Sequence, residues 1–114
     1  VFHLCLAIIP RGSMEFIGWC GLDHSDPAWP NPVLFFLLKA AHWGRGYGTE
    51  AARALLEHGF VTLQIPRLDS ACAFDNLASK RIMEKIGMRY LGLDEEGGHA
   101  FTLTREEYLQ ASAR

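Results

Sequence analysis

The chain has 114 residues, a length that fits one domain with a single hydrophobic core. Hydrophobic residues make up 49% of it and charged residues 21%, which is typical of a globular soluble protein. The formal net charge of −2 argues against a nucleic-acid-binding protein, which usually carries a basic face. The longest apolar runs are too short to cross a bilayer, so no membrane partner is expected.

The cysteines and histidines predict neither a disulfide framework nor a metal site. Cys5, Cys20 and Cys72 form no CxxC pair, and the five histidines lack the spacing of a zinc site. No basic-then-apolar leader opens the chain. We therefore expect a protein of the reducing cytoplasm that holds no metal.

The first part of the chain alternates β-rich runs with turns. Residues 1–9 and 15–22 flank a PRGS turn, which predicts an antiparallel hairpin. Residues 23–32 contain three prolines and are predicted to form a loop. The nearly continuous apolar run at 33–39 is typical of a strand covered on both faces.

Helical and strand patterns alternate in the rest of the chain. Apolar residues recur at helical spacing from Ala51 to Leu63, and Pro66 closes that region. A strand is predicted at 68–74, then a helix from an N-cap at Asn76 to a C-terminal glycine, Gly87. A hairpin of 88–93 with 99–104 follows, and the sequence TREE at 104–107 is a capping box for a short final helix.

This order of elements predicts one α/β (α+β) domain over residues 1–114. Two strands joined by a helix are expected to be parallel neighbours with a right-handed crossover. The remaining strands are expected to pair antiparallel. The predicted fold is therefore a mixed, mostly antiparallel sheet with a central parallel pair.

Three glycines, Gly44, Gly46 and Gly48, stand at alternate positions where the first long helix begins. The first N–H groups of a helix lack internal partners and can bind a phosphate, and Arg45 can add a positive charge. Alternatively, the glycines only make a tight turn and permit close helix–strand packing. The stretch lacks the Gly-Lys-Ser/Thr of a P-loop, and Thr49 replaces the third glycine of a dinucleotide-binding pattern.

Two blocks of sequence together resemble the GNAT superfamily of acyl-CoA-dependent N-acyltransferases. WGRGYGTEAARALLEHGF, residues 43–60, is followed after one predicted strand by DNLASKRIMEKIGM, residues 75–88. The first block fits the phosphate-loop pattern Q/R-x-x-G-x-G/A except at Trp43, and the second fits N-x-x-S-x-x-x-x-E-K-x-G. The resemblance spans residues 15–108 and is closest to the branch that acetylates ribosomal-protein N-termini.

The resemblance implies a GNAT-like fold, acetyl-CoA as co-substrate and an amine as acceptor. The pantetheine arm would lie where the parallel strands separate, paired with backbone groups of Leu37 and Leu38. The pyrophosphate would be held by Gly44, Arg45, Gly46, Tyr47, Gly48 and Thr49. Asn76 would hydrogen-bond the pantetheine arm, and Ser79 would be the catalytic residue beside the thioester. Alternatively, Asn76 is only a helix cap and Ser79 is only a neutral residue of the first helical turn.

The chain departs from its relatives at the groups that move protons. Val33 and Leu91 occupy the two positions where relatives place an acid, and Met83 occupies that of a tyrosine. Substitutes from other positions are Glu15, His24 and His42. Deprotonating a protein N-terminal amine at pH 7 costs only about 1–1.5 kcal/mol, so such an acceptor can react without a dedicated carboxylate.

From the resemblance we expect the chain to begin at its relatives' second strand, as an N-terminally incomplete domain whose first strand is a bare edge. Three explanations compete: the given sequence lacks its N-terminal part, the gene is a natural fragment, or a partner chain covers the edge. The third predicts a homo-oligomer through this strand, which a stable monomer in light scattering would contradict. Two other functions stay open: a catalytically degenerate acyl-CoA-binding domain, and a nucleotide-binding module on an unrelated fold. A thermal shift with acetyl-CoA separates the nucleotide module from the others, and thiol release with an amine panel separates enzyme from binder.

Overall fold

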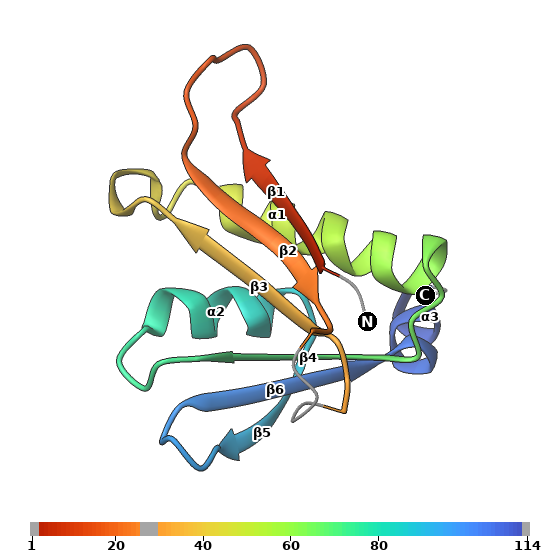
Figure 1. The fold of residues 1–114 in the computed structure, drawn as a ribbon. Helices are drawn as coiled ribbons and strands as arrows, with labels where there is room; N and C mark the ends of the chain where they lie inside the picture. The colour runs from red at the N-terminus through yellow and green to blue at the C-terminus, as the bar shows by residue number, and fades with distance from the viewer. Residues whose placement is uncertain (1–2, 26–29, 113–114) are drawn as a thin grey trace.

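A computed structural model describes residues 3–25 and 30–112 (Figure 1). These residues form one sheet in the order β1-β2-β3-β4-β6-β5. The strands are β1 (His3–Ile8), β2 (Gly18–Asp23), β3 (Val33–Leu38), β4 (Arg67–Cys72), β5 (Arg89–Leu93) and β6 (His99–Thr104). The β3–β4 pair is parallel and the other neighbours are antiparallel, which confirms the predicted mixed sheet. Residues 1–2 of the predicted first strand and 26–29 of the predicted loop lie outside the described residues.

Three α-helices accompany the sheet: α1 (Tyr47–Glu57), α2 (Leu77–Lys85) and α3 (Arg105–Ser112). A 3₁₀ turn, η1 (Ala40–His42), precedes α1, and a π turn, η2 (His58–Thr62), continues it. The helix α1 connects the two parallel strands, as expected. Phe60 lies within η2 and is buried, whereas Leu63 follows the last residue of η2 and is exposed, although both belong to the predicted apolar pattern.

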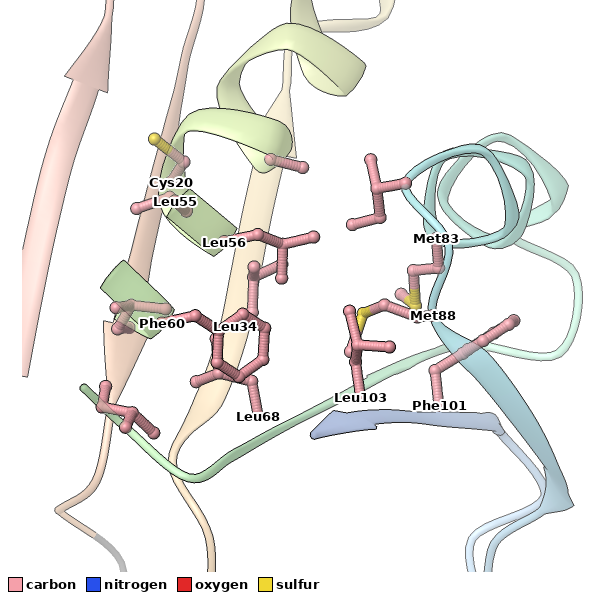
Figure 2. Close-up of a cluster of buried hydrophobic side chains, with 14 residues drawn as sticks. Cys20, Leu34, Leu55, Leu56, Phe60, Leu68, Met83, Met88, Phe101 and Leu103 are labelled. Atoms are coloured by element: carbon pink, nitrogen blue, oxygen red, sulfur yellow. The ribbon is translucent and has the colours of Figure 1, made fainter. Parts of the chain in front are cut away.

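The hydrophobic core lies between α1, α2 and one face of the sheet (Figure 2). Alternate strand residues point into it, because successive side chains of a strand face opposite sides. The largest contributors are Leu22, Leu34, Leu56, Phe60, Leu68, Met83 and Phe101. Full burial of one such side chain contributes about 1.5–3 kcal/mol. This core fixes how α1 and α2 lie relative to the strands.

The expectation that residues 33–39 form a strand covered on both faces is wrong. Leu34 is 1% exposed beneath the helices, whereas Leu37, on the other face, is 68% exposed. Trp19, the cross-strand neighbour of Leu37 in β2, is also exposed. An apolar run therefore does not show that both faces of a strand are covered.

The local signals at helix ends are confirmed. Asn76 Oδ1 accepts a hydrogen bond from Ser79 N at 3.1 Å, so Asn76 caps α2. Gly87 has φ +88° and its N–H donates to Glu84 O, which ends α2 as predicted. In the capping box, Glu107 N donates to Thr104 Oγ1 and Glu107 Oε1 accepts from Thr104 N, both at 3.1 Å.

Two predicted strands differ from the structure by two residues or more at one end. The second strand begins at Gly18 rather than residue 15, because its pairing with β1 starts at the Ile8–Gly18 pair. The strand predicted at 68–74 spans Arg67–Cys72, and Phe74 lies beyond it in an exposed position. Neither difference moves the glycine stretch or the start of α2.

Candidate functional site

The parallel strands β3 and β4 separate soon after they meet. Their ladder has one pair, Val33 with Asp69, supported by the bond from Asp69 N to Pro32 O at 3.0 Å. One residue further along, the buried Ser70 hydroxyl donates to Leu34 O at 2.7 Å, so a side chain bridges the strands in place of a backbone bond. Beyond this bridge the strands run apart and leave a wedge between them, and α2 packs beside α1 on one face of the sheet (Figure 1).

A cleft of about 190 Å³ lies beside the wedge. Its walls come from the end of β3, η1, the glycine stretch with the first turn of α1, and α2 with its cap. The lining residues from the first three are Phe36, Leu37, Leu38, His42, Trp43, Gly44, Gly46, Tyr47, Gly48 and Thr49. Those from α2 and its cap are Asn76, Ala78, Ser79, Arg81, Ile82 and Lys85.

The N-terminus of α1 presents unpaired backbone donors at this cleft. Gly46 is the N-cap, without a side-chain capping bond, and the first helical bond runs from Glu50 N to Gly46 O at 3.0 Å. In the described part of the chain, the N–H groups of Tyr47, Gly48 and Thr49 have no acceptor. These donors and the positive end of the helix dipole make an anion-binding arrangement.

Glycine is required at these three positions for two different structural reasons. Gly44 and Gly46 have φ values of +77° and +83°, a conformation that residues with a side chain rarely adopt. Gly48 lies within the helix, where an added Cβ would stand 2.7 Å from Ile82 Cδ1. The tight turn of the alternative interpretation is therefore present, but the close approach at Gly48 is to helix α2 and not to a strand. The turn is compatible with anion binding, because the helix N–H groups remain unpaired.

Nine of the ten predicted site residues line this one cleft. The exception is Arg45, which is exposed and not part of the lining. Asn76 uses Oδ1 to cap α2, while its Nδ2 has no partner among the described residues. The Ser79 hydroxyl likewise makes no hydrogen bond within residues 3–25 and 30–112. Both polar groups are thus open to a ligand.

Sequence reasoning missed the positive charge that α2 brings to the cleft. Ala78, Arg81, Ile82 and Lys85 follow the spacing i, i+3, i+4, i+7 and line the cleft from one face of α2. That spacing, with two basic residues, was the available signal. Trp43 was also missed as a structural residue: its Nε1 donates to Leu38 O at 2.8 Å and fixes the start of the glycine stretch.

Two of the candidate proton acceptors are hydrogen-bonded to each other. His42 Nε2 lies 3.0 Å from Glu15 Oε1, and His42 lines the cleft. His42 Nδ1 is buried without a partner in the described part of the chain. The third candidate, His24, lies elsewhere, in a second hollow beside the first residues of β3.

The thiol of Cys72 lies close to the cap of α2, 3.7 Å from Asn76 O. Burial raises the pKa of the Cys72 thiol, so it stays protonated near neutral pH and is a poor nucleophile. No group of three potential metal-ligating side chains occurs among the described residues. In the same part of the chain, no helix has the length and apolar character needed to span a bilayer.

The fold and cleft define an α/β protein in which two parallel strands separate beside a helix N-terminus that no side chain caps. A sequence model of the acetyltransferase (GNAT) domain matches residues 2–89, and the chain therefore belongs to the GNAT acetyltransferase family. The resemblance found in the two sequence blocks is confirmed.

Individual relatives agree with this family. An acetyltransferase structure from Agrobacterium tumefaciens has 34% identity and a TM-score of 0.79, covering 89% of this chain and 60% of that one. A putative ribosomal-protein-serine acetyltransferase from Vibrio cholerae has 21% identity and a TM-score of 0.76, covering 90% and 64%. An uncharacterized N-acetyltransferase, p20, of Bacillus licheniformis is 27% identical, and the match covers 90% of this chain and 62% of the p20 chain. The chain spans about half the length of the curated relatives it matches.

Proposed function

We propose that the protein transfers an acetyl group from acetyl-CoA to a primary amine by direct attack of the amine. The supporting observation is that the unpaired N–H groups at the start of α1 face a cleft beside the separated strands. A pyrophosphate needs such donors, and an extended arm would lie along the end of β3 near Leu37 and Leu38, where β4 no longer pairs with it. Localisation in the cytoplasm and a single domain over residues 1–114 are part of the same proposal.

The residues of the cleft fit a CoA thioester from end to end. The N–H groups of Tyr47, Gly48 and Thr49 would hold the phosphates, with Arg81 and Lys85 supplying positive charge. The Asn76 amide would bind the pantetheine arm through Nδ2, which its capping role leaves unused. The bound thioester supplies an activated acetyl group.

Ser79 is the catalytic residue in this proposal. The amine nitrogen forms a bond to the acyl carbon, the carbon–sulfur bond breaks, and the sulfur takes up a proton. An amine that begins as an ammonium ion loses two protons; the sulfur keeps one and the solvent receives the other. The Ser79 hydroxyl, which is open to the cleft, would donate a hydrogen bond to the departing sulfur.

The test replaces Gly46 by alanine and uses Gly12→Ala as its matched control. Both glycines have a left-handed φ, +83° and +80°, and a Cβ at either would meet no atom within 4 Å. Each variant should therefore lose a similar 1–2 kcal/mol or so of stability. Only Gly46→Ala should weaken acetyl-CoA binding, by about tenfold or more, because its Cβ would take up space meant for the phosphate. Equal acetyl-CoA affinity in the two variants, measured by calorimetry, would contradict the site.

A catalytically degenerate acyl-CoA-binding domain is the second candidate. The observation that favours it is that Val33 and Leu91 bring no acid to the positions where relatives have one. Release of CoA thiol with a panel of primary amines separates the two functions. Binding of acetyl-CoA without any amine-dependent thiol release would establish the binder and refute the transferase.

A further inference from the structure

A second hollow of about 340 Å³ adjoins the point where β3 and β4 separate. Its lining residues are Asp23, His24, Val33, Leu34, Phe35, Ser70 and Ala71. It thus includes the Ser70–Leu34 bridge between the strands. The first cleft is lined from Phe36 onward and this hollow up to Phe35, so the two use adjoining stretches of β3.

Asp23 brings an accessible carboxylate to this hollow. Its Oδ1 accepts hydrogen bonds from Ser25 N and from His3 Nδ1, each at 3.1 Å. These two bonds, that from Ser25 first, lower the pKa of Asp23, so the side chain is a carboxylate at neutral pH. Among the described residues, Oδ2 has no hydrogen-bond partner.

A second acid, Asp69, lies in the same row of paired residues across the sheet, but its carboxylate oxygens are already hydrogen-bonded within the protein. Asp23 and Asp69 flank Val33 in the strand register. Asp69 accepts bonds from Thr102 Oγ1 at 2.7 Å and from Arg67 Nε at 3.1 Å, and its other oxygen accepts from an asparagine amide. Asp23 is therefore the acid of this row that has an oxygen left for a ligand.

The apolar part of the hollow is held in a fixed shape. The Phe35 ring lies across Gly21, where an added Cβ would stand 2.5 Å from Phe35 Cζ. On β1, the His3 ring stacks with Phe35 at 6.0 Å between centroids and 17° between planes. Because His3 also binds Asp23, the aromatic wall and the carboxylate are positioned together. A carboxylate beside an apolar wall suits a cation with a short hydrocarbon stem.

Resting on the proposed transferase function, we propose that this hollow admits the acceptor and that Asp23 Oδ2 binds its positive charge. The acceptor class is then a primary alkylamine that arrives as an ammonium ion. Asp23 acts by binding, so its removal raises the KM for the amine more than it lowers kcat. His3 is a positioning residue that keeps Oδ1 engaged and leaves Oδ2 for the ligand.

The test compares n-butylamine with 1-butanol, which differ in charge and hardly in shape. Binding is measured by NMR titration with and without CoA, on the protein and on Asp23→Asn. Asparagine keeps Oδ1 as an acceptor for Ser25 and His3, so the variant should fold as the parent does. Glu106→Gln, on the first turn of α3, is the charge-matched control, because Glu106 lines neither hollow.

The protein should bind n-butylamine more tightly than 1-butanol. Asp23→Asn should abolish that preference, with roughly a fivefold loss for the amine and none for the alcohol or for CoA. Equal binding of amine and alcohol by the parent protein, or an unchanged preference in Asp23→Asn, would overturn the inference. Failure of the parent to bind CoA would instead refute the proposed function. The two failures can be distinguished, because the amine and CoA titrations are separate binding measurements that need no turnover.

Discussion

Replacing Ser70 by alanine tests how the parallel strands are held where they separate. Ser70 and Leu34 are both buried, and the Ser70 hydroxyl donates to Leu34 O at 2.7 Å. Alanine leaves that carbonyl, which is buried although a hollow adjoins it, without its donor. An unsatisfied buried group of this kind costs about 1–3 kcal/mol. We therefore expect the free energy of unfolding to fall by about that amount.

Urea unfolding followed by circular dichroism measures this change, and Ser13→Ala provides the comparison. Ser13 Oγ accepts from Glu15 N at 2.9 Å in an exposed loop, where water can replace it. That variant should lose no more than about 0.5–1 kcal/mol. Ser70→Thr, which keeps the hydroxyl, should retain more stability than Ser70→Ala. The reasoning about the bridge would be refuted if Ser70→Ala lost no more stability than Ser13→Ala.

Two further predictions concern charge at the cleft and at α3. Changing Arg81 and Lys85 together to glutamine should weaken acetyl-CoA binding by about fivefold at low salt and less at high salt, as measured by calorimetry. Lys80→Gln, over the Tyr90 ring rather than in the cleft, should leave the affinity unchanged, and equal losses would contradict the assignment. Hydrogen bonds from the Thr104 backbone and hydroxyl, with Arg89, lower the pKa of Glu107, so its stabilisation is present above its unfolded pKa and lost as pH falls through the folded value. The stability difference between the protein and Glu107→Gln should therefore shrink from pH 7 to pH 3 in urea unfolding; a constant difference would count against it.

The helix boundaries could be predicted because their determinants are close in sequence. Asn76 caps the N–H of Ser79, three residues away, and Thr104 and Glu107 cap each other across the same interval. Gly87 ends α2 through bonds to the preceding turn. Such contacts depend on backbone geometry over one helical turn, so the residue pattern alone specifies them.

The position of the cleft could also be predicted, but only part of its chemistry. The glycine stretch and the second block marked seven of the residues that line it, and the place of the pantetheine arm in the family marked Leu37 and Leu38. Arg81 and Lys85 were missed, because which face of α2 meets the cleft depends on how that helix packs. The open face of β3 was missed as well: Leu37 belongs to an apolar run, yet nothing in the run says what covers it.

The sequence by itself determined the order of the elements, the helix caps and the two GNAT blocks, since each is encoded within a short stretch of chain. Only the tertiary structure decided the contacts that complete the site. Ser70 reaches Leu34 across 36 residues, Glu15 reaches His42 across 27, and Asp23 comes to the same hollow as Ala71. Such pairs form because the strand register and the shared core bring distant segments together. A local residue pattern does not specify which residues far apart in the chain will be in contact.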